Sequence, residues 1–185
     1  YAFYLTMRSM HPNTSELCLI DVTGEATEIG IVREDVLRHT TFVPVGTFSI
    51  ARDLAKASGV PKQEAFTYMK DNPYEISERL PKRAQEKVFL ALEDYNEQVT
   101  NMFLLTGDKL KIPKTIFLHT DEKTEPFFVE QLESAAFSAT GKNHTVHPIT
   151  SKVLGLEAKN DTALLLSMNF IAKKENYLSL LPQDG

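Results

Sequence analysis

An aspartate stands near the point where an apolar run ends, and a carboxylate in that position can do chemistry. Residues 17–22 read LCLIDV, and after Asp21 the chain passes through Thr23 and Gly24 before apolar residues resume. A carboxylate at the end of a buried strand can hold the water ligands of Mg²⁺, because this ion keeps several waters and needs only one or two carboxylates. The same side chain can instead cap a turn by accepting hydrogen bonds from backbone amides. The residue types alone leave both interpretations open.

Other side chains that could bind a metal or attack a substrate are sparse. His119 is followed by Asp121 and Glu122, which admits a second metal hypothesis. His144 and His147 stand three positions apart on an expected strand, so their side chains should face opposite sides of the sheet. No serine or cysteine has a base at a recognisable spacing, so nucleophilic catalysis lacks support.

Composition favours one ordinary domain and excludes several classes of protein. The chain has 185 residues, of which 42% are hydrophobic, and a formal net charge of −5. This balance argues against binding to nucleic acid or to an anionic membrane. A single cysteine, Cys18, cannot form an internal disulfide and fits a reducing, cytosolic setting. No run reaches the roughly 18 to 20 apolar residues of a membrane span, no secretory signal is present, and the missing initiator Met suggests a piece of a longer chain.

Hydrophobic periodicity predicts the elements that must position Asp21. Residues 1–10 have helical spacing, 16–22 form a continuous apolar strand suited to the centre of a sheet, and 26–32 and 36–45 complete an antiparallel meander around a turn at 33–36. Helical periodicity follows, and Gly59, Gly107 and Gly141 mark the expected helix ends. The expected helices are 49–57, 61–72, 81–105, 125–139 and 161–173, the last capped by Asn160 or Asp161, with strands at 114–120 and 144–149.

This order of elements predicts an α/β domain. Three meander strands followed by alternating helices and strands should give a mixed sheet of about five strands covered by helices. Phe127 and Phe128 are adjacent on one expected helix, and we expect both in the core; the alternative is that one of them is exposed for a partner.

The motifs resemble the actin-like ATPase superfamily, and within it the bacterial FtsA and PilM families. Those families carry an LIDIG-x-x-x-T turn, and then a P-x-G-G element that opens a helix containing I-x-x-D-[LI]. The matching residues are Leu19, Ile20, Asp21, Gly24, Thr27, Pro44, Val45, Gly46, Ile50, Asp53 and Leu54. The likeness is strongest over residues 16–70 and continues in element order to about residue 172.

The resemblance implies a ribonuclease H-like lobe, the second of two that clasp a nucleotide. Residues 1–15 would be an incoming helix and loop, 16–175 the lobe itself and 176–185 a tail, with the first lobe absent from this chain. The turn would contact the β- and γ-phosphates of ATP, and Asp21 would orient magnesium through water. The physics of the residue types agrees, since glycine lets backbone amides approach a phosphate and amides at a helix start attract anions. The implied cofactor-binding residues are Asp21, Thr23, Gly24, Glu25, Thr27 and Gly46.

Three departures from the family pattern bear on nucleotide binding. Thr23 replaces the first glycine of the turn, and a β-branched residue disfavours a positive φ. Thr47 replaces the second glycine after Pro44. Residues 119–122, HTDE, stand where the family has a glycine pair that admits adenosine, and their carboxylates would repel a triphosphate. Nucleotide binding is therefore predicted to be weak or lost, and this chain alone is not expected to hydrolyse ATP.

The leading functional hypothesis is a PilM-like or FtsA-like scaffold of a bacterial envelope machine. It would be cytoplasmic, reach the inner face of the membrane through protein partners, and self-associate as filament-forming relatives do. One alternative is a working ATPase of the same family that uses Asp21, Gly24 and Thr27. Another is a peptide-binding module unrelated to ATP, which would use a sheet edge or the Phe127/Phe128 face.

Overall fold

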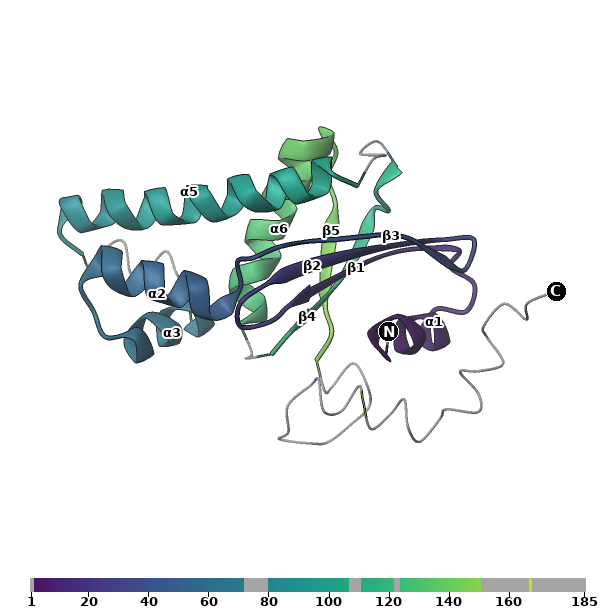
Figure 1. Ribbon diagram of the computed structural model, residues 1–185, viewed down its shortest axis with the longest axis horizontal. Coiled ribbons are helices and arrows are strands. Elements are labelled where there is room, and N and C mark those ends of the chain that lie inside the picture. Colours follow the sequence, from purple (N-terminus) through teal and green to yellow (C-terminus); the bar gives the residue numbers. More distant parts are fainter. Residues whose placement is uncertain (1, 72–79, 107–110, 122–123, 151–166, 168–185) are drawn as a thin grey trace.

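The chain forms a five-stranded mixed sheet with helices on both faces (Figure 1). The computed structural model describes residues 2–71, 80–106, 111–121, 124–150 and 167. In chain order the elements are α1 (Ala2–Met10), β1 (Glu16–Val22), β2 (Thr27–Arg33), β3 (Val36–Val43), α2 (Thr47–Ser58), α3 (Lys62–Asp71), α5 (Lys82–Leu104), β4 (Thr115–Thr120), α6 (Glu125–Thr140) and β5 (Thr145–Pro148). Within the described ranges, no helix is both long and apolar enough to cross a membrane.

Strand β1 is the centre of the sheet, as its continuous apolar sequence predicts. The strand order is β3-β2-β1-β4-β5, with β1 antiparallel to β2 and parallel to β4. Alternate side chains of β1 enter two different cores: Cys18 and Ile20 face α5 and α6, whereas Leu17 and Leu19 face α1. Burial on both faces is why the run is apolar at successive positions.

The meander of β1, β2 and β3 is confirmed, and a two-residue turn joins its last two strands. Glu34 and Asp35 have φ values of 50° and 64°, which is the left-handed geometry that matches the twist of a hairpin. A register shift follows Ile31 in β2. Strand β3 lies at the edge of the sheet, and its side chains are exposed or half-buried.

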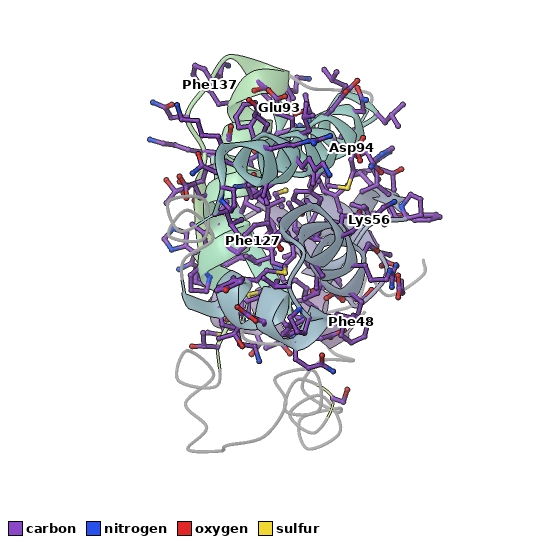
Figure 2. All side chains as sticks on the ribbon, turned by 90° about the vertical axis from the view of Figure 1, so that its left-hand side faces the viewer. Phe48, Lys56, Glu93, Asp94, Phe127 and Phe137 are labelled. Carbon is purple, nitrogen blue, oxygen red and sulfur yellow. The ribbon has the colours of Figure 1, made fainter. Side chains whose placement is uncertain are left out.

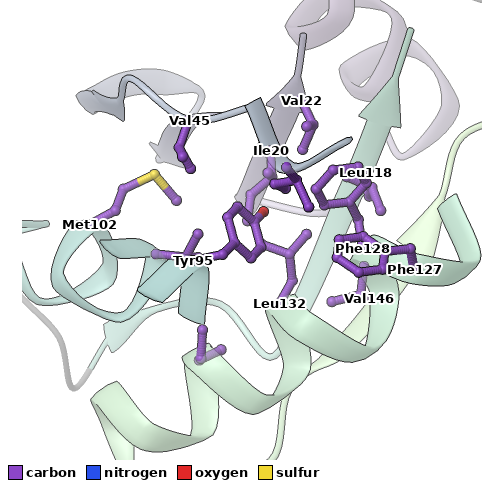
Figure 3. Packing of buried hydrophobic residues seen from close by; sticks show 14 of the residues in the cluster. Ile20, Val22, Val45, Tyr95, Met102, Leu118, Phe127, Phe128, Leu132 and Val146 are labelled. Carbon is purple, nitrogen blue, oxygen red and sulfur yellow. The ribbon is translucent and has the colours of Figure 1, made fainter. Parts of the chain in front are cut away.

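The larger core lies between the sheet and the helices α2, α5 and α6. Its centre is aromatic: the Tyr95 ring lies 5.8 Å from that of Phe128, which meets Phe127 edge-on at 5.0 Å (Figure 3). Both phenylalanines are buried, and Phe127 lies in the interior among the helices in Figure 2. The expectation of two core residues is therefore confirmed, and the alternative of an exposed Phe127/Phe128 face is wrong.

Glycine ends two of the helices where the sequence predicts. Gly59 after α2 and Gly141 after α6 have φ values of 78° and 69°, and each amide bonds back into the last helical turn. Pro126 lies in the first turn of α6. The other predicted element ends agree within a few positions. Gly107 and the expected helix over 161–173 lie outside the described residues, apart from Ser167, which is helical.

Helix α1 covers part of the opposite face of the sheet and is fixed there by polar contacts. Leu5 and Met7 pack on the α1 face of β1 and β4. The Arg8 guanidinium donates to backbone carbonyls in the loop 11–14 at 2.9 to 3.3 Å and pairs with the Asp35 carboxylate at 2.8 Å. Tyr4 donates its hydroxyl to the Asp35 carbonyl at 2.7 Å. These contacts connect α1 to the β2–β3 turn.

Candidate functional site

Asp21 lies near the carboxyl end of β1 on the α1 face, where it pairs with a buried histidine. The parallel register places Asp21 opposite His119 of β4. The two side chains meet at 2.7 Å between Oδ1 and Nδ1, with His119 3% exposed and Asp21 38% exposed. Since a carboxylate only accepts, the imidazole Nδ1 is the donor. The Phe3 ring of α1 lies 6.0 Å from the His119 ring. The buried His119 imidazole thus orients the half-exposed carboxylate of Asp21.

The turn after β1 is closed by Thr23. Its amide donates to the Ala26 carbonyl at 2.9 Å, and its hydroxyl lies 3.3 Å from the Ala26 amide nitrogen. Of the described non-glycine residues only Glu34 and Asp35 have positive φ, so Thr23 needs no left-handed conformation. Thr23 thus fits without a positive φ, because this turn uses a side-chain hydroxyl where a glycine-based turn uses conformational freedom.

The start of α2 packs directly on this turn. The amides of Thr47 and Phe48 donate to the carbonyls of Thr23 and Gly24 at 3.0 and 2.7 Å. A Cβ on Gly46 would lie 2.3 Å from the Thr23 carbonyl oxygen, and one on Gly24 would lie 2.5 Å from the Phe48 ring. Both glycines are therefore explained by close approach. Two amides that could attract an anion at the helix start already bond within the chain.

Glu25 points from the turn onto the first turns of α2. Its carboxylate accepts two hydrogen bonds from the Arg52 guanidinium, at 2.7 and 2.8 Å, and a third from the Ser49 hydroxyl at 3.1 Å. The Arg52 hydrogen bonds and charge lower the pKa of Glu25 to about 2, with a smaller contribution from Ser49. The pair is exposed, at 62% for Glu25 and 49% for Arg52, so it fixes geometry more than it adds stability.

Thr27 lies on the other face of the sheet from Asp21. It is fully buried, and its hydroxyl donates to the Val45 carbonyl at 2.8 Å. A contact with phosphate would require this hydroxyl to leave its partner. The role of Thr27 in binding stays a prediction, as do those of the other turn residues.

The structure brings most of the predicted site residues into one turn, and it adds partners that sequence reasoning missed. His119, Ser49 and Arg52 contact the site from distant positions in the chain. The signal for His119 was present, since IFLHT and LCLIDV both read as apolar strands with a polar residue near the carboxyl end. His119 pairs with Asp21 as described above, and Glu122 of the metal hypothesis lies outside the described residues. Within the described part of the chain, no three His, Cys, Asp or Glu side chains gather closely enough for a metal ion.

The residues present fit ATP with magnesium only in part. Asp21 is exposed enough to hold a water ligand of Mg²⁺. Glu28 lies directly across from it on β2 and is exposed, whereas the negative charge of Glu25 on the turn is paired with Arg52. Like charges this close to a polyphosphate oppose its binding. The carboxylates suit a cation, whereas the turn offers little to a triphosphate.

No protein-family model matches the sequence. The cell division protein FtsA of Pseudomonas aeruginosa is 37% identical over 49 residues, which are 26% of this chain and 12% of FtsA. Among solved structures, a PilM–PilN type IV pilus biogenesis complex superposes with a TM-score of 0.57 at 11% identity, covering 97% of this chain and 52% of the other. MreB 5 of Spiroplasma citri bound to AMPPNP gives 0.57 at 12% identity, covering 97% and 61%.

These likenesses show the fold. The chain has the mixed sheet and covering helices of the actin-like ATPases, as the sequence predicts. It spans about half to three-fifths of the length of the two superposed structures.

Proposed function

We propose that this chain, which has the actin-like ATPase fold, is one lobe of a two-lobed scaffold protein in a bacterial envelope machine. Nucleotide binding at the lobe is weak or lost. The protein acts in the cytoplasm and reaches the inner face of the membrane through protein partners, and it can self-associate. The likeness to PilM in a complex with PilN and to a segment of FtsA supports the envelope role.

A single observation carries the loss of nucleotide affinity: the chain's own groups already occupy the turn where phosphates are expected. The carbonyls of Thr23 and Gly24 accept the first amides of α2, and the Glu25 carboxylate lies on Ser49 and Arg52. A polyphosphate would have to approach this carboxylate and those of Asp21 and Glu28. Arg52 balances the charge of Glu25 and is engaged by it, so the carboxylates of Asp21 and Glu28 supply the repulsion.

Calorimetric titration with ATP and magnesium tests this part of the proposal. We expect no binding heat at about 1 mM nucleotide, which corresponds to less than about 4 kcal/mol of affinity. Binding tighter than about 0.1 mM that is lost in both Asp21→Ala and Asp21→Asn would overturn it. The asparagine variant keeps the shape of the side chain, so its loss would identify the charge as the cause.

The second candidate is a working ATPase of the same family, and one observation favours it. Asp21 is half-exposed near the carboxyl end of the central strand and accepts a hydrogen bond from His119. The structural neighbour MreB 5 has AMPPNP bound. ATP hydrolysis by the complete protein that disappears in Asp21→Asn would favour this candidate over a scaffold.

The scaffold role is tested by crosslinking in bacterial cells, followed by purification of the protein. Components of a pilus, secretion or division assembly should be captured, and the same components should be lost when the crosslinker is left out and the protein is purified under denaturing conditions. Recovery of cytosolic enzymes alone would contradict the envelope assignment.

A further inference from the structure

Among the described residues, helix α1 covers only part of its face of the sheet. It packs on Leu19 of β1, Val32 of β2 and Phe117 of β4, all of which are buried. On β3, by contrast, Phe42 is 62% exposed and Leu37 is 40% exposed. The open side is thus the part of the face formed by β2 and β3.

This open side contains a hollow of about 460 Å³, which we call the shelf, lined by Phe3, Asp21, Glu28, Gly30, Leu37 and Phe42 among others. Gly30 forms a bare floor: a Cβ there would lie 3.3 Å from Leu37 and would begin to fill the hollow. Phe3 on α1 forms one wall, and Phe42 on β3 lies at the other side. The shelf can therefore take a side chain between two aromatic rings.

The charges of the shelf have one sign. Asp21 and Glu28 are directly opposite each other on β1 and β2, and Glu28 is paired in turn with Phe42 on β3. None of the described residues that line the shelf is basic. An apolar surface next to two carboxylates attracts a cation attached to an apolar group and repels an anion.

We propose that the shelf binds a segment of a partner protein that presents an apolar side chain beside a lysine or arginine. The apolar side chain lies against Phe42 and Leu37, and the cation reaches Glu28 and Asp21. In an extended segment, residues two apart point to the same side, so an apolar-x-basic sequence meets both features. The proposal rests on the proposed scaffold role and names the chemistry of its partner.

Three capped tripeptides test the shelf by nuclear magnetic resonance with the full chain and no nucleotide. They are Phe-Thr-Arg, Phe-Thr-Gln and Phe-Thr-Glu, so that only the third side chain changes, and its charge runs from positive through neutral to negative. We expect millimolar binding of the arginine peptide, with shifts centred on the amides of Gly30 and Thr40, about threefold weaker binding of the glutamine peptide and none of the glutamate peptide.

Two variants and a matched control locate the binding. Glu28→Gln should reduce the difference between the arginine and glutamine peptides, because only Asp21 then remains to meet the cation, and Phe42→Thr should weaken the binding of both peptides about threefold or more. The control is Glu93→Gln, an equally charged and exposed residue on α5 (Figure 2), which should leave the difference intact. All three positions are exposed, and the spectra report folding directly.

Three results would overturn the proposal: a charge preference unchanged by Glu28→Gln, a peptide affinity unchanged by Phe42→Thr, or shifts confined to another surface. A complete parent protein that rejects the peptides while this chain binds them would also overturn it, because the shelf would then be covered from within the same protein. These titrations contain no ATP, so their failure is distinct from failure of the nucleotide prediction.

Discussion

At the scale of single residues, Glu25 is the side chain whose charge state the structure affects most clearly. Arg52 lowers its pKa to about 2 from the ordinary value of 4.5. A carboxyl whose pKa is lower in the folded state stabilises the fold above its unfolded pKa, and this contribution is lost as pH falls towards the folded value. The stabilisation from Glu25 should therefore be complete above about pH 5 and decline from pH 4.5 towards 2.

Urea unfolding of the wild type and of Glu25→Gln at several pH values measures the stabilisation that Glu25 contributes. The midpoint difference between the two should be constant from about pH 7 to 5 and shrink below about pH 4.5. Glu93→Gln serves as a control for net charge, since Glu93 is exposed on α5. A difference that is the same at pH 3.5 and pH 7 would contradict the role assigned to the carboxylate.

Gly46 is the glycine that the packing of the turn most strictly requires. Its missing Cβ would lie 2.3, 2.6 and 2.9 Å from backbone atoms of Thr23, Ala26 and Glu25, none of which can move alone. Gly46→Ala should therefore cost about 2 kcal/mol or more of unfolding free energy. Chemical denaturation checks this value.

Gly59→Ala is the matched control for that substitution. Gly59 has open space around its Cβ position but a φ of 78°, so alanine there should cost only about 1 kcal/mol, through backbone strain. Equal effects at the two sites would show that the α2 start does not pack on the turn as described.

At the scale of elements, Arg8 is the contact that fixes α1. Its side chain is 14% exposed, donates to carbonyls of the loop 11–14 and pairs with Asp35. Arg8→Ala should cost about 1 kcal/mol, because it removes the hydrogen bonds to the loop carbonyls and the ion pair with Asp35. Hydrogen exchange should speed up in α1 and at the β2–β3 turn before it does in β1. Lys56→Ala, at an exposed position of α2, should change neither the free energy of unfolding nor these exchange rates.

Helices and strands were predictable because their signals are local. The alternation of apolar residues, Gly59 and Gly141 at helix ends and the apolar run around Cys18 each act within a few positions. The contacts between elements were not predictable in this way. Asp21 and His119 are 98 positions apart in the chain, and Glu25 and Arg52 are 27 apart. Sequence reasoning grouped His119 with its neighbours in the chain, whereas the parallel register of β1 and β4 groups it with Asp21.

At the scale of the whole molecule, the two cores share one sheet and should unfold together. Phe128 is completely buried, and its ring lies beside those of Tyr95 and Phe127 in the larger core (Figure 3). Phe128→Ala should cost about 3 to 5 kcal/mol through the lost contacts and the cavity that remains. Because β1 contributes to both cores, α1 should lose protection from exchange by a similar amount, although it lies on the opposite face. If only α5 and α6 lose protection from hydrogen exchange, the two faces of the sheet unfold separately.

The overall architecture was predictable, whereas the state of the phosphate turn was not. Motif order pointed to the actin-like fold, which the structural neighbours show. The sequence showed that Thr23 stands where the family has a glycine. It could not show that the Thr23 hydroxyl closes the turn or that Arg52 binds the Glu25 carboxylate. Those details depend on how α2 approaches the sheet.

The buried position of Cys18 makes its thiol a natural probe for the rate at which the sheet opens. Its thiol has no exposed surface in the central strand, and burial raises its pKa, so neither collision with a reagent nor ionisation occurs while the sheet is intact. A maleimide added in large excess would therefore label the chain at the rate at which the sheet opens, independent of reagent concentration. One mass measurement per time point would then give the lifetime of the closed sheet without any introduced probe.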